Sequence, residues 1–407
     1  MGELSSRAAA SPPEQRACLM RIGCKAAIAA TLLSTFLAWQ SGHTQTEALG
    51  YFPDRASLHR DLWQSYAYVT SGEVNPNVID WTVQFASAYG REDLIVSIVE
   101  RYISRPCVSE EPFDPEKIRE AIKAHQVVVI SETHHSADDR QRILDMARIF
   151  ADEGFTYYAA ETFQDEVFTA GIKTGINAGF YSSEPFYGRL LRELAHLEFK
   201  FVPFEARLSG QVEGDRRILR EQVQAANIID RVLKENPDAR ILVHVGWAHA
   251  FESPEDEYGM AWMARRLKEM SGIDPLTISQ TFCRANGDEA VLIRGADEGG
   301  KDELSHTDLA IGIPSWSFLD GRPSWHRNLG FHPVPVPAAL RDETLPVIVE
   351  AMPEGSDELA VPEDRLLIAP EETHVLMLPD GTYDLFSFTQ AGQMRGPVRI
   401  EVTSLAE

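Results

Sequence analysis

The pattern of hydrophobic and polar positions changes twice along the chain. From about residue 55 to 104, apolar residues recur every three to four positions, which predicts helices, and the break NPN at 75–77 separates them. From about 115 to 295, solid apolar runs alternate with amphipathic stretches. After about 305, proline and glycine become frequent and short apolar runs alternate with turns. The pattern therefore predicts a helical preface, an α/β unit and a β-rich C-terminal unit.

The middle section predicts a parallel sheet. Alternation of strands and helices with short connections favours right-handed crossovers, with helices on both faces. The strands are apolar throughout, as parallel strands buried on both faces are. The expected fold class is a three-layer α/β/α arrangement with a mainly parallel sheet. Strands are expected at 127–132, 156–161, 199–205, 240–246, 276–282 and 290–295, and the intervening helices at about 138–153, 184–198, 213–235 and 257–271.

Four segments follow from these boundaries. Residues 1–45 are set apart as a targeting segment, 46–110 form the helical preface, 111–304 form the α/β domain, and 305–407 form the C-terminal unit. Within the last unit, PDG at 379–381 lies between two apolar runs and predicts a hairpin turn.

The first 45 residues are typical of an exported protein. Arg16, Arg21 and Lys25 precede the apolar stretch AAIAATLLSTFLAW at 26–39, which is short for a membrane span. We expect a signal peptide and a periplasmic or secreted location. An uncleaved N-terminal anchor and a buried N-terminal helix are the alternatives.

The cysteines bear on the same question. Two of the four lie in the targeting segment, so Cys107 and Cys283 are the pair that an exported chain would retain. An even pair in an oxidising compartment favours one disulfide. Two separate buried thiols are the alternative.

The net charge limits the partners. The chain has 62 acidic and 38 basic residues, for a formal charge of −24. This argues against a nucleic-acid surface, which needs a basic footprint, and against docking on anionic lipid. We expect a small-molecule or peptide substrate, with a membrane contacted only through an N-terminal anchor. The sequence does not indicate an oligomeric state.

Ionisable side chains follow the carboxyl ends of four expected strands. In an open α/β sheet, ligands bind outside these ends. We therefore expect Glu132, His134, Glu161 and His249 to converge on one cleft. Ordinary polar loops at the strand ends are the alternative. The ionisable residues, in chain order, are Glu132, His134 and His135, then Glu161, then Glu205 with Arg207, then His249.

The residue types indicate acid–base chemistry. An imidazole takes a proton from water near neutral pH, and a neighbouring carboxylate fixes its tautomer. We expect His134 to be a general base, Glu132 and Glu161 to orient or charge it, and His249 to act as a second base or as an electrophile. His134, Glu161 and His249 would equally suit a divalent metal with an open position for water. No tight metal motif such as H-E-x-x-H accompanies them.

Five further residues are candidates for substrate binding. Arg220 either reaches the strand ends or pairs on the surface, Trp247 either lines a pocket or fills the core, and His135 either contacts substrate or belongs to a loop. Glu205 and Arg207 complete the set. His244, in the middle of a strand, is expected to be a core histidine.

Four short motifs together resemble a known superfamily. They are S-E-T-H at 131–134, A-A-E-T-F at 159–163, R-E-x-x-Q-A-x-N from Arg220 and V-G-W-A-H at 245–249. In this order they resemble the erythromycin esterase / ChaN-like / Tiki superfamily, over about residues 115–300. That group has a G-x-x-H motif after its first strand, a glutamate ending the next, an R-D-x-x-M-A-like helix start and a second G-x-x-H. This chain departs from the pattern at Ser131, where glycine is usual, and at Gln224, where methionine is usual.

The resemblance implies an α/β/α fold with a site between the two G-x-x-H motifs. Members of the group hydrolyse macrolide lactones, act as metal-dependent peptidases or bind haem, so the fold does not settle the function. We expect an exported hydrolase of an ester or amide bond. A haem- or metal-binding uptake protein and a non-catalytic protein with a degenerate site are the alternatives. Haem needs an axial ligand and a broad apolar wall, so a mouth rich in carboxylates favours hydrolysis.

Overall fold

The computed structural model describes residues 52–72, 82–99, 106–107, 111–165, 174–208, 214–253, 260–287, 289–294 and 306–404. The expected signal or anchor at 1–45 lies outside these ranges. Among the helices within them, none is long and apolar enough to cross a membrane.

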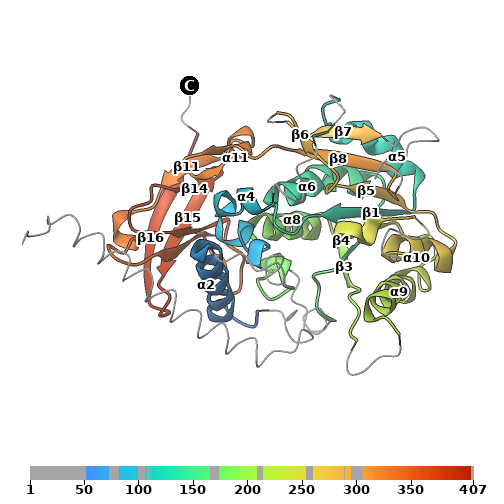
Figure 1. Ribbon diagram of the computed structural model, residues 1–407, viewed down its shortest axis with the longest axis horizontal. Helices are drawn as coiled ribbons and strands as arrows, with labels where there is room; N and C mark the ends of the chain where they lie inside the picture. The colour runs from blue at the N-terminus through green and yellow to red at the C-terminus, as the bar shows by residue number, and fades with distance from the viewer. Residues whose placement is uncertain are drawn as a thin grey trace, which may run out of the picture.

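A mainly parallel sheet lies at the centre of the α/β part (Figure 1). Its strands follow the order β3-β2-β4-β1-β5-β8-β6, all parallel, and β7 pairs antiparallel with β8. The expected α/β fold class is confirmed. The strands are β1 (Val127–Glu132), β2 (Tyr157–Ala160), β3 (Lys200–Pro203), β4 (Ile241–Gly246), β5 (Leu276–Ser279), β6 (Arg284–Ala285), β7 (Val291–Arg294) and β8 (Leu309–Pro314).

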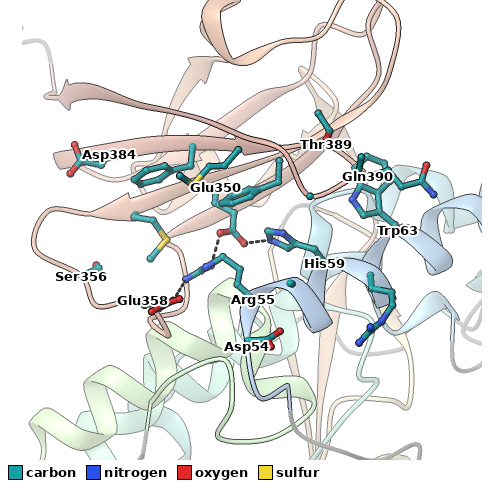
Figure 2. Close-up of a pocket in the computed structure, with 18 of the residues that line it drawn as sticks. Asp54, Arg55, His59, Trp63, Glu350, Ser356, Glu358, Asp384, Thr389 and Gln390 are labelled. Carbon is teal, nitrogen blue, oxygen red and sulfur yellow. Dashed lines mark hydrogen bonds and ion pairs between the residues drawn. The ribbon is translucent and has the colours of Figure 1, made fainter.

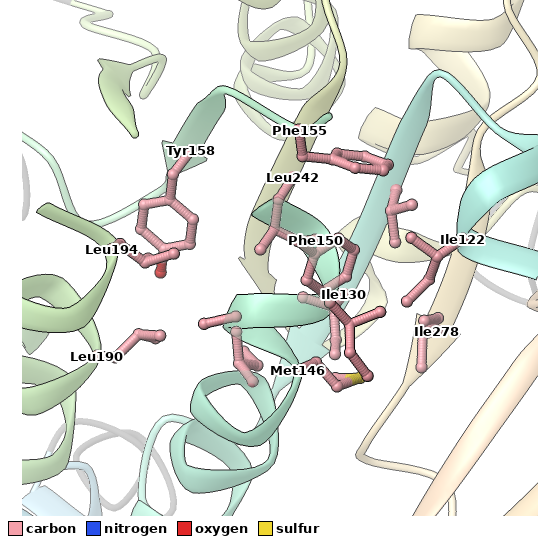
Figure 3. Packing of buried hydrophobic residues seen from close by; sticks show 14 of the residues in the cluster. Ile122, Ile130, Met146, Phe150, Phe155, Tyr158, Leu190, Leu194, Leu242 and Ile278 are labelled. Atoms are coloured by element: carbon pink, nitrogen blue, oxygen red, sulfur yellow. The ribbon is translucent and has the colours of Figure 1, made fainter. Parts of the chain in front are cut away.

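Helices cover both faces of this sheet because alternate strand residues point to opposite faces. Val128 and Ile130 belong to the same buried cluster as residues of α6 and α8, part of which Figure 3 shows. Val127 and Val129 pack instead with α9 and α10. The helices are α5 (Arg119–Ala124), α6 (Ala137–Asp152), α8 (Pro185–His196), α9 (Arg216–Ile228), which continues as a π-turn (Ile229–Leu233), and α10 (Met263–Ser271).

The C-terminal part is antiparallel. Four strands pair in the order β13-β12-β15-β16, and β11 pairs with β14. Because β14 and β15 pair with different partners, residues 379–380 connect two sheets, and the hairpin turn predicted at 379–381 is wrong. The remaining elements are β9 (Phe318–Leu319), β10 (Arg322–Pro323), α11 (Trp325–Asn328), β11 (His332–Pro335), β12 (Val347–Pro353), β13 (Asp364–Ile368), β14 (Val375–Leu378), β15 (Gly381–Phe388) and β16 (Met394–Val402).

The helical preface packs on this C-terminal part. It contains α2 (Arg55–Ser71) and the short α4 (Val96–Val99). Leu58 and Leu62 of α2 share a buried cluster with Ile348 of β12. An Asp54 capping box begins α2, because the Asp54 carboxylate accepts from the Ser57 backbone N–H at 2.7 Å.

Two details of the central sheet differ from the expected series. β8 lies beyond residue 304, the expected end of the α/β domain; the glycine and proline in its run L-A-I-G-I-P resemble those of a turn region. β7 is antiparallel to β8, although a parallel strand was expected at 290–295. Residues 286–290 separate β6 from β7. So short a connection reverses the chain, because a parallel crossover needs about a dozen residues or more.

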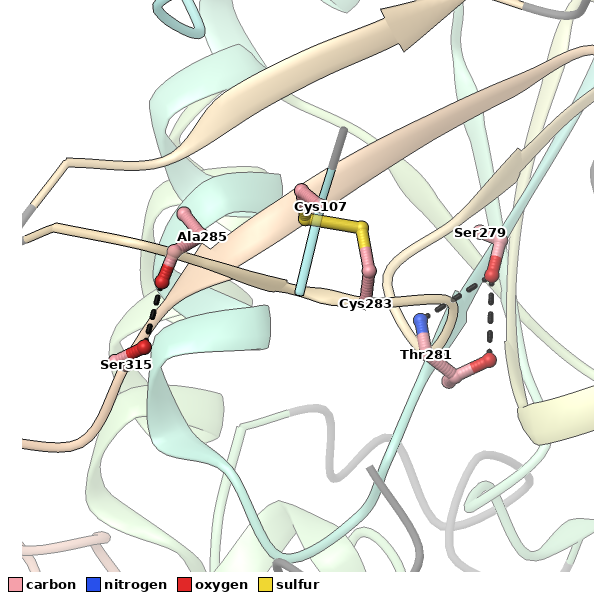
Figure 4. Close-up of a disulfide and its surroundings, with 6 residues drawn as sticks. All are labelled: Cys107, Ser279, Thr281, Cys283, Ala285 and Ser315. Carbon is pink, nitrogen blue, oxygen red and sulfur yellow. Dashed lines mark hydrogen bonds between the residues drawn. A yellow bond between two sulfur atoms is a disulfide. The ribbon is translucent and has the colours of Figure 1, made fainter. Parts of the chain in front are cut away.

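Cys107 and Cys283 form a disulfide at the edge of this sheet (Figure 4). Their Cα atoms lie 5.1 Å apart. A Cβ added at Gly312 of β8 would lie 2.2 Å from the Cys107 sulfur, so glycine there leaves room for the bridge. The bridge ties the segment around Cys107 to the strand that begins after Cys283.

We expect this disulfide to be present in the isolated protein. Alkylation without reductant should leave Cys107 and Cys283 unmodified, and alkylation after reduction should label both, as read by peptide mass mapping. Because the bridge closes a loop of 176 residues, replacing both cysteines by serine should lower the free energy of unfolding by about 2–5 kcal/mol. Labelling of both residues without reductant would contradict the bridge.

Candidate functional site

The ionisable residues lie at the carboxyl ends of four neighbouring strands, at one edge of the sheet. In the order β3-β2-β4-β1, these strands lead to Glu205, Glu161, His249 and Glu132. Glu132 is the last residue of β1, and Glu161 follows β2 directly. His249 lies in a single 3₁₀ turn (Trp247–Ala250) after β4. Parallel pairing therefore gathers residues that are more than 100 positions apart in the sequence.

The Glu132 carboxylate is the centre of a buried network. Arg140 of α6 donates to both of its oxygens, at 2.8 and 2.9 Å. His134 donates from Nδ1 at 2.7 Å, and His244 Nε2 lies 3.0 Å from the second oxygen. Burial raises the pKa of Glu132, but the charges of Arg140 and His244 outweigh burial and hold the pKa well below its usual range. Glu132 is therefore ionised, and as an acceptor it keeps the His134 proton on Nδ1, which leaves the lone pair on Nε2.

The His134 ring is clamped by Tyr181 and Gly246. It stacks on Tyr181, with ring centroids 4.0 Å apart and planes 10° from parallel. It also packs closely against Gly246, where an added Cβ would lie 2.1 Å from His134 Nε2. The backbone φ of His134 is 62°, in the left-handed region that a non-glycine residue adopts only when its surroundings enforce it. The clamp holds the ring in one position.

A second histidine and carboxylate pair lies on the neighbouring strand end. His249 donates from Nδ1 to Glu221 of α9 at 2.6 Å, and its Nε2 accepts from Arg220 at 3.0 Å. His249 Nε2 also lies 3.7 Å from Glu161. Burial lowers the pKa of His249, but the charges of Glu161 and Glu221 outweigh burial and raise the pKa above its usual value.

Glu161 connects the two histidines. One of its oxygens accepts from the backbone N–H of Gly246, beneath His134, at 2.8 Å, and the other accepts from Arg220 at 2.6 Å. Burial raises the pKa of Glu161, but His249, Arg220 and His134 outweigh it and hold the pKa far below its usual range. Arg220 also donates to both oxygens of Glu205, at 2.9 and 2.5 Å. Gln224, which stands where the superfamily has methionine, donates to Glu205 at 3.1 Å.

The structure thus places six of the nine candidate residues in two adjacent networks that meet at Gly246: Glu132 with His134, and Glu161, Glu205, Arg220 and His249. Arg220, for which two positions were considered, reaches the strand ends. His244 is buried in β4, as expected of a core histidine, and its Nδ1 forms a hydrogen bond with the Tyr158 hydroxyl at 2.7 Å. Its Nε2 also lies 3.0 Å from Glu132.

The other three candidates lie around this network. The buried His135 ring is 6.0 Å from Trp247 and 5.8 Å from Trp316, centroid to centroid. Trp247 is 37% exposed, so it borders the site and does not fill the core. The structure does not place Arg207 with the histidines; it pairs at the surface with Asp165, at 3.7 Å.

Sequence reasoning missed three members of the network. Arg140 lies in the first turn of α6, where a run of charged residues reads as a solvated helix end. Glu221 lies next to Arg220 on α9. In the sequence it is only an acidic residue beside a candidate arginine, and nothing there indicates its contact with His249. Tyr181 lies in a short 3₁₀ turn (Tyr181–Ser183) within a loop, and no sequence pattern pointed to it.

The residues of the site are not arranged to bind the divalent metal that their types suggested. Among the described residues, no group of three or more histidine, cysteine, aspartate or glutamate side chains is arranged to hold a metal ion. Arg220 explains this, because its guanidinium contacts His249, Glu161 and Glu205, the donors that a divalent cation would need. A haem would meet the same charges where it needs an apolar wall.

The comparisons with known proteins are remote. No protein-family model matches the chain, and no curated protein matches its sequence. Solved structures that resemble it include the type III effector HopBA1, with 13% identity over 52% of this chain and 97% of that one, at a TM-score of 0.35. They also include ChaN of Campylobacter jejuni, a structure that shows cofacial heme binding. It has 10% identity over 49% of this chain and 92% of that one, at a TM-score of 0.31. A third is RRSP, a MARTX toxin effector domain from Vibrio vulnificus, with 13% identity over 64% of this chain and 48% of that chain, at 0.30.

We expect Gly246→Ala to disturb the site through a steric clash alone. The φ and ψ of Gly246, −90° and 148°, suit alanine, but the new methyl group would overlap the His134 ring. Overpacking of this kind lowers the free energy of unfolding by about 1–3 kcal/mol. Urea denaturation measures it. Gly287→Ala is the matched control, since nothing lies within 4 Å of its added Cβ, and it should change stability by less than about 0.5 kcal/mol. Equal effects of the two substitutions would contradict the clamp.

Proposed function

We propose that this site hydrolyses an ester or amide bond by attack of water. One observation carries the proposal: two histidines on neighbouring strand ends each donate from Nδ1 to a buried carboxylate, and Glu161 lies 3.7 Å from His249 Nε2. A histidine held in this way keeps Nε2 as its working atom, which is the arrangement that general acid–base catalysis needs.

His134 is the general base in this proposal. Glu132 fixes the Nδ1–H tautomer and stabilises the imidazolium that forms when Nε2 takes a proton. Arg140 keeps Glu132 ionised through the reaction, since it donates to both carboxylate oxygens. The water oxygen then bonds to the carbonyl carbon of the substrate while its proton passes to His134 Nε2.

His249 is the general acid. It acts once Nε2 is protonated and no longer accepts from Arg220, a form that the charges of Glu161 and Glu221 favour because they raise its pKa. The Nε2–H then gives its proton to the departing alcohol or amine as the bond to the carbonyl carbon breaks. The water proton on His134 then replaces the proton that His249 loses, by way of solvent, and the ring states are restored. Products are a carboxylic acid and an alcohol or amine, with no oxidant or further reactant.

Arg220 is a positioning residue. Its N–H groups are occupied by Glu161, Glu205 and His249, so it sets the positions of the carboxylates and of His249. Because it already contacts the would-be ligands of a metal, the mechanism uses no metal ion. We also propose that the protein acts outside the cytoplasm, a location that the disulfide at Cys107 and Cys283 favours.

His134→Ala and His249→Ala should each lower the rate of hydrolysis by about 10²–10⁴-fold, the usual contribution of one positioned acid–base group. The measurement is release of p-nitrophenol or p-nitroaniline from a panel of activated esters and anilides. His332→Ala, which removes a partly exposed histidine paired with Asp380 in the C-terminal part, is the matched control and should retain the wild-type rate.

Circular dichroism shows whether each variant is folded. Wild-type rates in both site variants would sink the proposal. A wild-type activity that disappears with chelator and returns with a divalent metal would replace the metal-independent mechanism, and stoichiometric haem in the isolated protein would favour the binding alternative.

Glu221→Gln should lower the pKa of His249. The substitution removes a negative charge in direct contact with Nδ1 and so destabilises the imidazolium. The shift should be about one pH unit or more, as read from the ring Cε1–H resonance of His249 by NMR. In hydrolysis, the alkaline fall in rate should move to lower pH by the same amount. An unchanged His249 titration would show that Glu221 does not charge this ring.

A further inference from the structure

A cavity of about 1160 Å³ lies away from the strand-end network. It opens between α2 and the face of β12 and β15 that carries Glu350 and Phe386, as Figure 2 shows. None of the site residues described above lines it. Its volume is in the range of pockets that bind drug-sized ligands, or slightly above it.

The walls of the cavity are largely aromatic and apolar. Phe386 and Phe388 project from β15, Met352 from β12 and Trp63 from α2. Met394, at the start of β16, is 60% exposed at the rim, among the most exposed of the large hydrophobic side chains described. So much uncovered apolar surface in one hollow is typical of a binding site.

The charges deep in the cavity are already paired. Glu350 accepts from Arg55 at 2.5 Å and lies 3.0 Å from His59, and Arg365 contacts it from behind at 2.7 Å. Burial raises the pKa of Glu350, but Arg55, Arg365 and His59 outweigh it and keep the carboxylate ionised. At the rim, Asp384 pairs with Arg399 at 2.9 Å. The other charged residues of the lining, Asp54, Arg60, Asp357 and Glu358, are exposed. A charged ligand group would therefore find no free countercharge deep in the cavity, and burying it there would be unfavourable.

One polar atom in the wall lacks a partner. Trp63 is 6% exposed, and among the described residues its indole Nε1–H has no hydrogen-bond acceptor. A buried donor of this kind is normally satisfied, so its place on a ligand-sized hollow points to an acceptor that the described residues do not supply. The acceptor must be carried by something that also covers the aromatic wall.

We propose that this cavity binds an uncharged amphipathic molecule, with an apolar body against Phe386, Phe388 and Met352 and a carbonyl or ether oxygen that accepts from Trp63 Nε1. The apolar walls supply the driving force, the paired interior excludes a charged group, and the indole selects for an acceptor. This site is independent of the hydrolytic function proposed for the strand ends.

Binding of Nile red to the full chain tests the proposal, because this dye is uncharged, carries a carbonyl acceptor and fluoresces in apolar surroundings. Trp63→Phe keeps the ring and removes the donor, so the dissociation constant should rise about 2–10-fold, the value of one neutral hydrogen bond. Ala56→Trp, at an exposed helix position that lines the cavity, should weaken binding at least about tenfold by filling it. Trp325→Phe is the matched control, since that buried tryptophan does not line the cavity, and it should leave binding unchanged.

Competition defines the ligand class. The ether 1-O-dodecylglycerol, which has no ester bond to cleave, should displace the dye at a concentration at least about tenfold lower than laurate or dodecyltrimethylammonium, since only the neutral compound enters without burying a charge. Absence of dye binding, or equal binding by all variants, would overturn the site. Stronger competition by laurate or by the ammonium compound would overturn the claim that the ligand is uncharged. Hydrolysis rates in these variants should equal those of the wild type, so either proposal can fail without the other.

Discussion

The Glu132 carboxylate is the constraint on which the strand-end site depends. A charge buried at the end of a central strand is tolerated only when ion pairs and hydrogen bonds satisfy it, and removal of one partner typically costs about 3–5 kcal/mol. Arg140 meets this requirement from α6, His244 from β4 and His134 from the loop after β1. One carboxylate therefore fixes the start of a helix, the pairing of two strands and the direction of a histidine ring.

Arg220 repeats this arrangement with the charges exchanged. Here a cation from α9 is surrounded by Glu161, Glu205 and the lone pair of His249. The two networks meet at Gly246, whose N–H binds Glu161 and whose missing side chain makes room for His134. Each histidine contacts a buried carboxylate of its own, and the raised pKa of His249 follows from the charges of Glu161 and Glu221 near it. In the proposed mechanism, this raised pKa gives His249 the role of the acid and leaves the role of the base to His134.

The sequence predicted the fold and the strand-end residues for a physical reason. A run such as VVVI is hydrophobic on both faces and has few alternatives to a buried parallel strand, so Glu132 at its end was easy to place. Strand order was not predictable, because it is set by long-range pairing, and it is this order that brings His249 beside Glu161. Arg140 and Glu221 were missed because a charged residue on a helix looks the same whether it faces solvent or a buried partner. β8 was missed because its glycine and proline resemble a turn, although Gly312 is needed beside Cys107.

The central claim is that histidine-activated water attacks the substrate directly. It is tested most directly by a single turnover with excess enzyme in H₂¹⁸O, using an ester or anilide that the protein cleaves. The account predicts one ¹⁸O atom in the carboxylic acid from the first turnover and no acylated protein by intact mass. Acylated protein, or an acid product whose new oxygen comes from the protein, would contradict it.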